Sequence, residues 1–197
     1  MPGWQKYIFG IILREQYALK YVIVKIKKGE NMYTVISGTN RDDSNTEKVA
    51  KQYVDMLAAK GIAANYLSLR GLNVLNRDND FIIIEKDMLI PAEKFIFVSP
   101  EYNGSIPGVL KAMIDITDIR KVWWGKKALL TGVSTGRAGN LRGMEDLTGI
   151  LNYLKMFVHH NKLPISVVDK LLNGEGLITD KSTLHAMEMQ LDEFIKF

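Results

Sequence analysis

The chain has 197 residues, of which 47% are hydrophobic and 24% charged, a composition typical of a folded globular domain that excludes a disordered, collagen-like or coiled-coil protein. The absence of cysteine excludes disulfides, thiolate metal sites, cysteine nucleophiles and iron–sulfur clusters. The net charge of +4 arises within residues 1–31, so residues 32–197 are balanced and predict no nucleic-acid partner, and no apolar run is long enough to predict a membrane span.

Residues 1–31 are predicted to be an N-terminal extension outside the fold. Their apolar run at 7–13 is ended by two charged residues and lacks a small-residue cleavage site, so we expect no signal peptide and a cytoplasmic protein. The alternating residues 21–27 are compatible with an edge strand. Residues 27–32 can also be encoded as a purine-rich ribosome-binding site followed by a start codon. We favour the hypothesis that translation begins at Met32.

Apolar, β-branched segments alternate with helical or irregular sequence along the rest of the chain. The predicted strands are residues 32–37, 63–69, 95–99, 128–133 and 164–168. The predicted helices are residues 45–60, 107–116, 141–160 and 184–194. Residues 70–93 give the weakest pattern, with a short helix and a polar loop as the best interpretation. This alternation predicts an α/β fold with a parallel sheet covered by helices on both faces.

The turn at residues 37–46 joins the first predicted strand to the first predicted helix. It offers hydroxyls, amides, Arg41 and the N–H groups of a helix start, which together suit a phosphate dianion. The alternative is a plain polar turn in which Ser44 or Asn45 caps the helix. The turn matches neither the P-loop nor the usual dinucleotide-binding motif.

Two further turns follow the third and fourth predicted strands. Residues 99–108 contain two prolines and two glycines, which restrict the backbone to a path that can present main-chain groups to a flat heterocycle. Tyr102 adds an aromatic surface there, unless it only covers the sheet edge. Glycines spaced through residues 134–143 allow close approach of a ligand or another subunit, which alone is a weak signal.

Residues 100–115, PEYNGSIPGVLKAMID, closely resemble the second flavin loop and following helix of the NADPH-dependent FMN reductase family. Gly38, Arg41 and Ser44 match that family's phosphate loop, G-S-x-R-x-x-S-x-N. The resemblance covers residues 32–197 and implies a flavodoxin-like, doubly wound, five-stranded sheet with strand order 2-1-3-4-5. It implies FMN as cofactor and NADPH or NADH as co-substrate, with hydride passing to flavin N5 and electrons then to a small acceptor such as free flavin, a quinone or an azo compound.

The resemblance also implies a set of cofactor-binding residues. Those expected around the FMN phosphate are Thr39, Arg41, Ser44, Asn45 and Thr46, with Asn40 as a further candidate in the same turn. Those expected along the isoalloxazine ring are Pro100, Glu101, Tyr102, Asn103 and Gly104, with Ser134 and Gly136 at its far edge. No catalytic acid or base and no metal site is assigned. Asp42 and Asp43 depart from the family pattern and have to point to solvent to avoid repelling the phosphate. Arg137 has two candidate partners, the edge of the flavin and the phosphate of a nicotinamide nucleotide, and the sequence does not decide between them.

Several residues outside these turns also carry predictions. With only three histidines in the chain, His159 and His160 are expected to cap the helix at 141–160 rather than bind a metal. Trp123 and Trp124 are expected to pack in the core or between subunits.

Apolar residues lie off the main stripe of the helix at 141–160. Ile150, Met156 and Phe157 predict a second buried face, hence a homodimer, unless they are covered within one chain. The family resemblance implies dimers or dimers of dimers.

Two other function classes remain open from the sequence. One is a flavodoxin-type electron carrier, against which the balanced charge of residues 32–197 argues, because such carriers dock by charge. The other is a flavin-free module that binds a different phosphate in the first turn.

Overall fold

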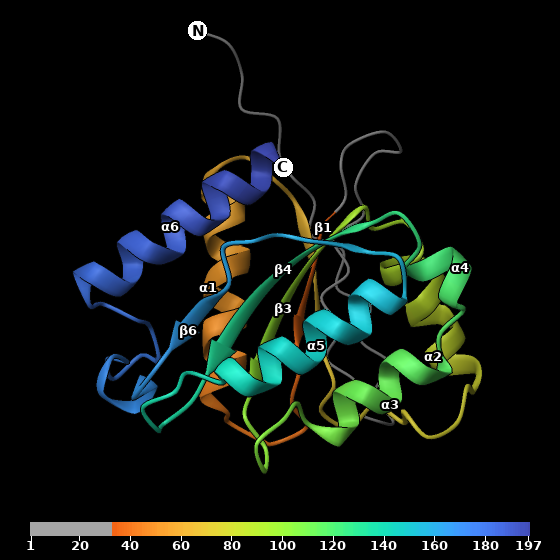
Figure 1. Ribbon diagram of the computed structural model, residues 1–197, viewed down its shortest axis with the longest axis horizontal. Helices are drawn as coiled ribbons and strands as arrows, with labels where there is room; N and C mark the ends of the chain where they lie inside the picture. The colour runs from red at the N-terminus through yellow and green to blue at the C-terminus, as the bar shows by residue number, and fades with distance from the viewer. Residues whose placement is uncertain (1–32) are drawn as a thin grey trace, which may run out of the picture.

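The computed structural model describes residues 33–197, so Met32 and the N-terminal extension lie outside the described residues (Figure 1). The strands are β1 (Tyr33–Ser37), β2 (Ala64–Ser68), β3 (Lys94–Pro100), β4 (Lys127–Val133), β5 (Phe157–Val158) and β6 (Leu163–Ile165). The α-helices are α1 (Asn45–Ala59), α2 (Asn79–Ile84), α3 (Gly108–Ile116), α4 (Ile119–Val122), α5 (Leu141–Tyr153) and α6 (Lys181–Lys196). A π-helix, η1 (Glu85–Leu89), continues α2, and a 3-10 helix, η2 (Val168–Lys170), follows β6.

The strands form one sheet in which every neighbouring pair is parallel. Its order is β2-β1-β3-β4-β5, and β6 also pairs with β4. β5 lies beside the start of β4 and β6 beside its end, so two short strands share the fifth position. The predicted doubly wound parallel sheet with order 2-1-3-4-5 is confirmed. The strand predicted at residues 164–168 is shorter and begins one residue earlier, as β6, and its predicted last residue, Val168, begins η2. The other strand at this position, β5, lies in residues predicted to be helical.

Helices cover both faces of the sheet, with α1 and α6 on one side and α2, α3 and α5 on the other (Figure 1). Alternate residues of a strand point to opposite faces, so the central strands β1, β3 and β4 supply both cores and are mostly apolar. The buried residues that α1 and α6 contribute are Val49, Ala50, Tyr53, Leu57, Met187, Leu191 and Phe194. Those from α2, α3 and α5 are Phe81, Ile84, Leu110, Met113, Ile114, Met144, Leu147 and Leu151.

The prediction of a helix over residues 141–160 is wrong in its second half. α5 ends at Tyr153, and Lys155 has a left-handed backbone with φ of 59°, which turns the chain out of the helix. The chain then runs beside β4 as β5, where Val158 packs against the same core as α5. Because a strand residue also satisfies the helical apolar spacing, the pattern alone did not reveal this break.

The prediction that His159 and His160 cap this helix is therefore also wrong. His159 follows β5, and its backbone N–H donates to Ala128 O at 2.8 Å, which extends the pairing with β4. Its buried ring contacts the rings of Phe194 and Phe197 edge-on, at the end of α6. The two histidines thus lie between the sheet edge and the last helix.

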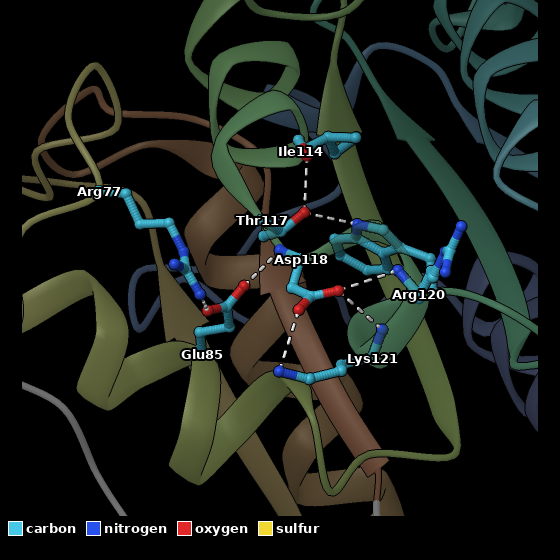
Figure 2. A network of polar contacts seen from close by, with 8 residues as sticks. Arg77, Glu85, Ile114, Thr117, Asp118, Arg120 and Lys121 are labelled. Atoms are coloured by element: carbon cyan, nitrogen blue, oxygen red, sulfur yellow. Dashed lines mark hydrogen bonds and ion pairs between the residues drawn. The ribbon is translucent and has the colours of Figure 1, made fainter.

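A buried carboxylate within residues 70–93, the segment with the weakest sequence pattern, connects this segment to the turn between α3 and α4, as Figure 2 shows. Glu85 pairs with the Arg77 guanidinium and accepts a hydrogen bond from the backbone N–H of Asp118, between α3 and α4. In the same network the Thr117 hydroxyl accepts from Trp123 Nε1 at 2.7 Å. Trp123 therefore lies in the core, as predicted. The charged groups explain why this packed segment lacked a clear apolar pattern.

Trp124 is partly exposed, unlike its neighbour in the chain. The Lys155 ammonium lies 3.8 Å from the centre of its indole ring, and the Arg120 guanidinium lies 5.2 Å away. These cation–π contacts hold the ring at the surface. Of its two predicted places, the core is therefore wrong, and packing between subunits stays a prediction.

Candidate functional site

Three loops leave the sheet at the carboxyl ends of adjacent strands. Ser37 at the end of β1 pairs with Val98 of β3, and Pro100 at the end of β3 pairs with Val133 of β4. The loops that follow therefore share one edge of the sheet. The winding direction reverses between β1 and β3, and ligands of open parallel sheets bind at such a point.

The loop after β1 presents the start of α1. Ser44 is the N-cap, and its hydroxyl accepts from Glu47 N at 3.1 Å, as one of the predicted alternatives required. The cap leaves the Ser44 O–H available as a donor. The exposed Asn40 and Arg41 precede it, and the first turn of a 15-residue helix directs N–H groups and a positive dipole end outward.

The two aspartates of this loop are exposed, and each pairs with a cation. Asp42 pairs with Arg70 at 3.3 Å, and Asp43 pairs with Lys48 at 3.0 Å. Both carboxylates are 86% exposed, so solvent and a cation screen each of them. The prediction that they point to solvent is confirmed, and the loop keeps its capacity for an anion.

The loop after β3 is a tight hairpin. Tyr102 and Ser105 exchange backbone hydrogen bonds, with Tyr102 N to Ser105 O at 2.9 Å and the return bond at 3.2 Å. Between them, Asn103 and Gly104 both have positive φ, 54° and 86°, which is the pattern of a type I′ turn. Asn-Gly is the preferred dipeptide for such a turn, so the rigid path predicted here has a local cause.

Tyr102 joins the first two loops directly. Its hydroxyl shares a hydrogen bond of 2.6 Å with the Thr39 hydroxyl, which also accepts from Arg41 N at 3.2 Å. The Arg41 guanidinium lies 4.1 Å from the centre of the Tyr102 ring. Thr39, Arg41 and Tyr102 are the predicted site residues that the structure brings into contact.

The third loop, which follows β4, packs against itself and against the neighbouring strand β6. The Ser134 hydroxyl accepts from Gly139 N at 3.0 Å and donates to Gly136 O at 2.9 Å, which closes the loop on itself. A Cβ at Gly139 would lie 2.5 Å from Pro164 on β6, and one at Gly132 would lie 2.0 Å from Gly139 O. For Gly139 the close approach is thus to β6 at the sheet edge, whereas the predicted approach to a ligand or another subunit stays a prediction for this loop. Arg137 is exposed at the tip of this loop.

Asn140 is a site-edge residue that sequence reasoning missed. It is buried with φ of 63°, and its Nδ2 donates to Ser99 O at 2.8 Å, which ties the third loop to the end of β3. A Cβ at Gly143 would lie 2.2 Å from Asn140 Oδ1. An asparagine followed three residues later by glycine was the available signal, and it is too common to single out.

The other predicted residues lie along the same edge. Glu101 is half-buried, 3.5 Å from Arg142 of α5, and Pro100 is the last residue of β3. Asn45 and Thr46 open α1, with Thr46 buried. The edge thus combines the start of α1 with a rigid hairpin and an aromatic ring. These features define a flavodoxin-like α/β protein suited to a phosphorylated, flat cofactor.

The model of the NADPH-dependent FMN reductase family matches residues 33–167. The chain belongs to this family, as its motifs indicated. It is 26% identical over 169 residues to a 2-hydroxy-1,4-benzoquinone reductase from Burkholderia sp., an alignment that covers 81% of this chain and 92% of that protein. It is also 26% identical to an NAD(P)H-dependent FMN reductase from Pseudomonas aeruginosa, over 79% of this chain and 89% of the relative.

Among solved structures, the NAD(P)H:(acceptor) oxidoreductase FerB from Paracoccus denitrificans superposes with a TM-score of 0.69. Its identity is 22%, over 85% of this chain and 96% of FerB, so this likeness shows the shared fold. The family establishes an oxidoreductase enzyme that uses FMN and NAD(P)H with small-molecule acceptors. It favours the reductase over the electron carrier and the flavin-free module. Among the described residues, no helix has the length and apolarity to cross a bilayer.

Proposed function

We propose that this protein is an NAD(P)H-dependent quinone reductase whose FMN lies along the edge formed by the three loops. When bound, FMN would supply two-electron chemistry: it would take up a hydride from NAD(P)H at N5 and pass on a hydride, which together with one proton from solvent converts a quinone to a hydroquinone. Support for a quinone comes from the relatives, of which one is a 2-hydroxy-1,4-benzoquinone reductase and two are quinone reductases. The chain's own residues bind and orient the cofactor.

The first loop fits the phosphate end of FMN. Arg41 and the start of α1 supply positive charge, and Ser44 retains a hydroxyl donor, while Asp42 and Asp43 are paired on the outside. The remaining phosphate-loop residues in this proposal are Thr39, Asn40, Asn45 and Thr46. The carboxylates nearest this donor set are paired with cations: Asp42 with Arg70, Asp43 with Lys48, and Glu47 of the first turn of α1 with Lys51 at 2.7 Å.

The second and third loops fit the ring end. The hairpin at Pro100–Gly104 holds its main chain rigid, which suits hydrogen bonds to the edge of the isoalloxazine and orients its reactive face. Ser134 and Gly136 close the far edge in this proposal. The Ser134 hydroxyl is engaged within its own loop, so main-chain groups would face the ring there.

The contact of Thr39 and Arg41 with Tyr102 carries the proposal, because it brings the loop at the start of α1 next to the hairpin. A single ligand that contacts both loops requires this arrangement. The test is steady-state oxidation of NADH and NADPH by the FMN-loaded protein with a benzoquinone, free FMN and an azo dye as acceptors. We expect the highest kcat/KM with the quinone. If free FMN is reduced faster than the quinone, free FMN is the acceptor and the quinone proposal is wrong. If no acceptor supports turnover, the assignment as a reductase is contradicted.

A second copy of the chain is proposed to cover the groove between α3 and α5. Ile106, Ile114 and Ile150 line this groove, and Tyr153 beside it is 84% exposed. Lys111 of α3 and the acidic residues Glu145 and Asp146 of α5 line the same groove, so a two-fold axis can bring opposite charges of two copies together. Within one chain Lys111 pairs with Asp115 and Glu145 with Lys162, so these pairs would be shared or exchanged at the interface. The predicted second apolar face at residues 141–160 is wrong for Met156, which is buried in the hydrophobic core of a single chain.

Light scattering after size exclusion tests this assembly. We expect a dimer for the native chain and a monomer for Tyr153→Glu, because a carboxylate would be buried without a partner in the interface. Glu188→Gln, at an exposed position on α6 away from the groove, serves as the control and should remain dimeric. A monomeric native chain would contradict the proposal.

A further inference from the structure

Two histidines and a glutamate from distant parts of the chain meet beside the sheet edge, away from the loops described above. His159 and His160 follow β5, and Glu193 lies near the end of α6. One nitrogen from each ring and one carboxylate oxygen lie within 4.8 Å of one another. The two imidazole rings lie against each other, with centres 4.5 Å apart and planes tilted by 36°.

Asn161 holds two of these side chains in place. Its backbone N–H donates to His159 Nδ1 at 3.3 Å, and its side-chain Nδ2 donates to Glu193 Oε2 at 2.8 Å. Its carbonyl accepts from the buried Gln190 Nε2, also at 2.8 Å. The Gln190 amide oxygen accepts in turn from the Tyr53 hydroxyl at 2.6 Å. The cluster is therefore anchored to the core through a continuous chain of hydrogen bonds.

The chemistry of the three groups is that of a transition-metal site. His159 is 2% exposed, and its imidazole and that of the adjacent His160 each offer a nitrogen ligand. The Asn161 N–H donates to the single in-plane lone pair of His159 Nδ1, so a metal at this nitrogen would displace that bond, which at 3.3 Å is long and weak. Glu193 adds a negative charge and a hard oxygen ligand.

We propose that His159, His160 and Glu193 bind one divalent transition-metal ion, with Zn²⁺ as the best match to two nitrogens and one oxygen. Zn²⁺ binds such ligands at about 2.0–2.2 Å in a tetrahedral arrangement, with water in the fourth position. The three ligand atoms have to draw closer than they stand now. The exposed His160 side chain and the half-buried Glu193 have the freedom to do so.

The position of the site assigns it a structural role. Val158 pairs with Ala128 at the start of β4, whereas the FMN loops leave the opposite, carboxyl ends of the strands. A metal here would join the strand-end segment at 159–160 to the last turns of α6, without contact with the flavin or its substrates. Binding to the folded state alone raises stability by mass action, so a higher melting temperature is expected.

The test is calorimetric titration of the tag-free, FMN-loaded protein with ZnCl2, together with thermal melts with and without the metal. We expect one Zn²⁺ per chain and a higher Tm. His160→Ala and Glu193→Gln should each weaken binding at least about tenfold and remove the shift in Tm. His185→Ala is the matched control, because His185 is exposed on α6 outside the cluster, and it should bind Zn²⁺ as the native chain does.

The controls separate this site from general affinity of histidines for zinc. Glu193→Gln preserves the shape of the side chain and its oxygen acceptor, so a fold check by circular dichroism isolates the loss of the ligand. NADPH oxidation should be the same with and without Zn²⁺, as expected for a site remote from the flavin. Absence of zinc binding by the native chain, or equal binding by His160→Ala and Glu193→Gln, would overturn the proposal. Loss of binding in His185→Ala would place the metal elsewhere and overturn it as well.

Discussion

The hydroxyl of Thr39, after β1, lies 2.6 Å from the hydroxyl of Tyr102, after β3. This bond joins the loop at the start of α1 to the Asn103–Gly104 hairpin, and the Arg41 guanidinium on the Tyr102 ring strengthens the join. The phosphate end and the ring end of the proposed FMN site are thus set by one contact. Either loop alone is a common feature of α/β proteins. The bond between them fixes how far apart the two ends of the proposed FMN site lie.

The Thr39–Tyr102 bond is expected to couple the two loops energetically. Thr39→Val and Tyr102→Phe each remove one hydroxyl, so each should lower the free energy of unfolding by about 1 kcal/mol and weaken FMN binding several-fold. The double variant should lose little more than either single variant, because the bond is already absent. A double-mutant cycle by urea unfolding and fluorescence titration measures this, and strictly additive losses would rule out the coupling.

Arg41 is expected to recognise the phosphate of FMN rather than its ring. Arg41→Ala should weaken FMN binding by about 10- to 100-fold, the size of a charge-assisted contact of about 1.5–3 kcal/mol. Riboflavin, which lacks the phosphate, should bind the native chain and the variant with similar affinity. Flavin fluorescence quenching measures both ligands. Arg70→Ala is the control, since Arg70 pairs with Asp42 on the outside of the same loop. Undiminished FMN affinity in Arg41→Ala would refute the role.

Gly104 is expected to be required by the hairpin. At φ of 86° an alanine is strained, so Gly104→Ala should lower stability by about 1–2 kcal/mol and loosen the flavin ring. Gly108→Ala is the matched control in the same segment, because its φ is ordinary and a Cβ there would touch nothing within 4 Å. Urea unfolding and the flavin absorption band measure the two effects. Equal stability of both variants would argue against a strained turn.

The N-cap of α6 is expected to make stability depend on acid pH. Hydrogen bonds from Ser182 and Thr183 lower the pKa of Asp180 to about 2. The carboxylate therefore stabilises the fold above the unfolded pKa of about 3.9 and loses this effect as pH falls through about 2. Asp180→Asn cannot titrate, so the native chain should melt at a higher temperature than the variant above pH 4, and the gap should close toward pH 2. Melts across this range test it, and a constant gap would contradict the assignment.

Local patterns were sufficient for the parts of the protein that depend on near neighbours in sequence. Alternating apolar segments predicted the parallel sheet, because burial on both faces demands continuous apolar strands. Ser44 at the start of α1 and the Asn103–Gly104 turn follow from capping and positive φ, which involve only a few residues. The motif around residues 100–115 was enough to indicate the family, which the comparison with known sequences then confirmed.

Contacts between distant segments were decided by tertiary structure alone. The apolar spacing continued past Tyr153 because the strand residue Val158 faces the same core, so only packing shows where α5 ends. That break moves His159 to the side of Glu193, 34 positions further along the chain, and no short-range pattern encodes such a meeting. The same holds for Asn140, which precedes α5 and donates a hydrogen bond to Ser99 near the end of β3. A buried bond between two loops depends on how the strands are aligned.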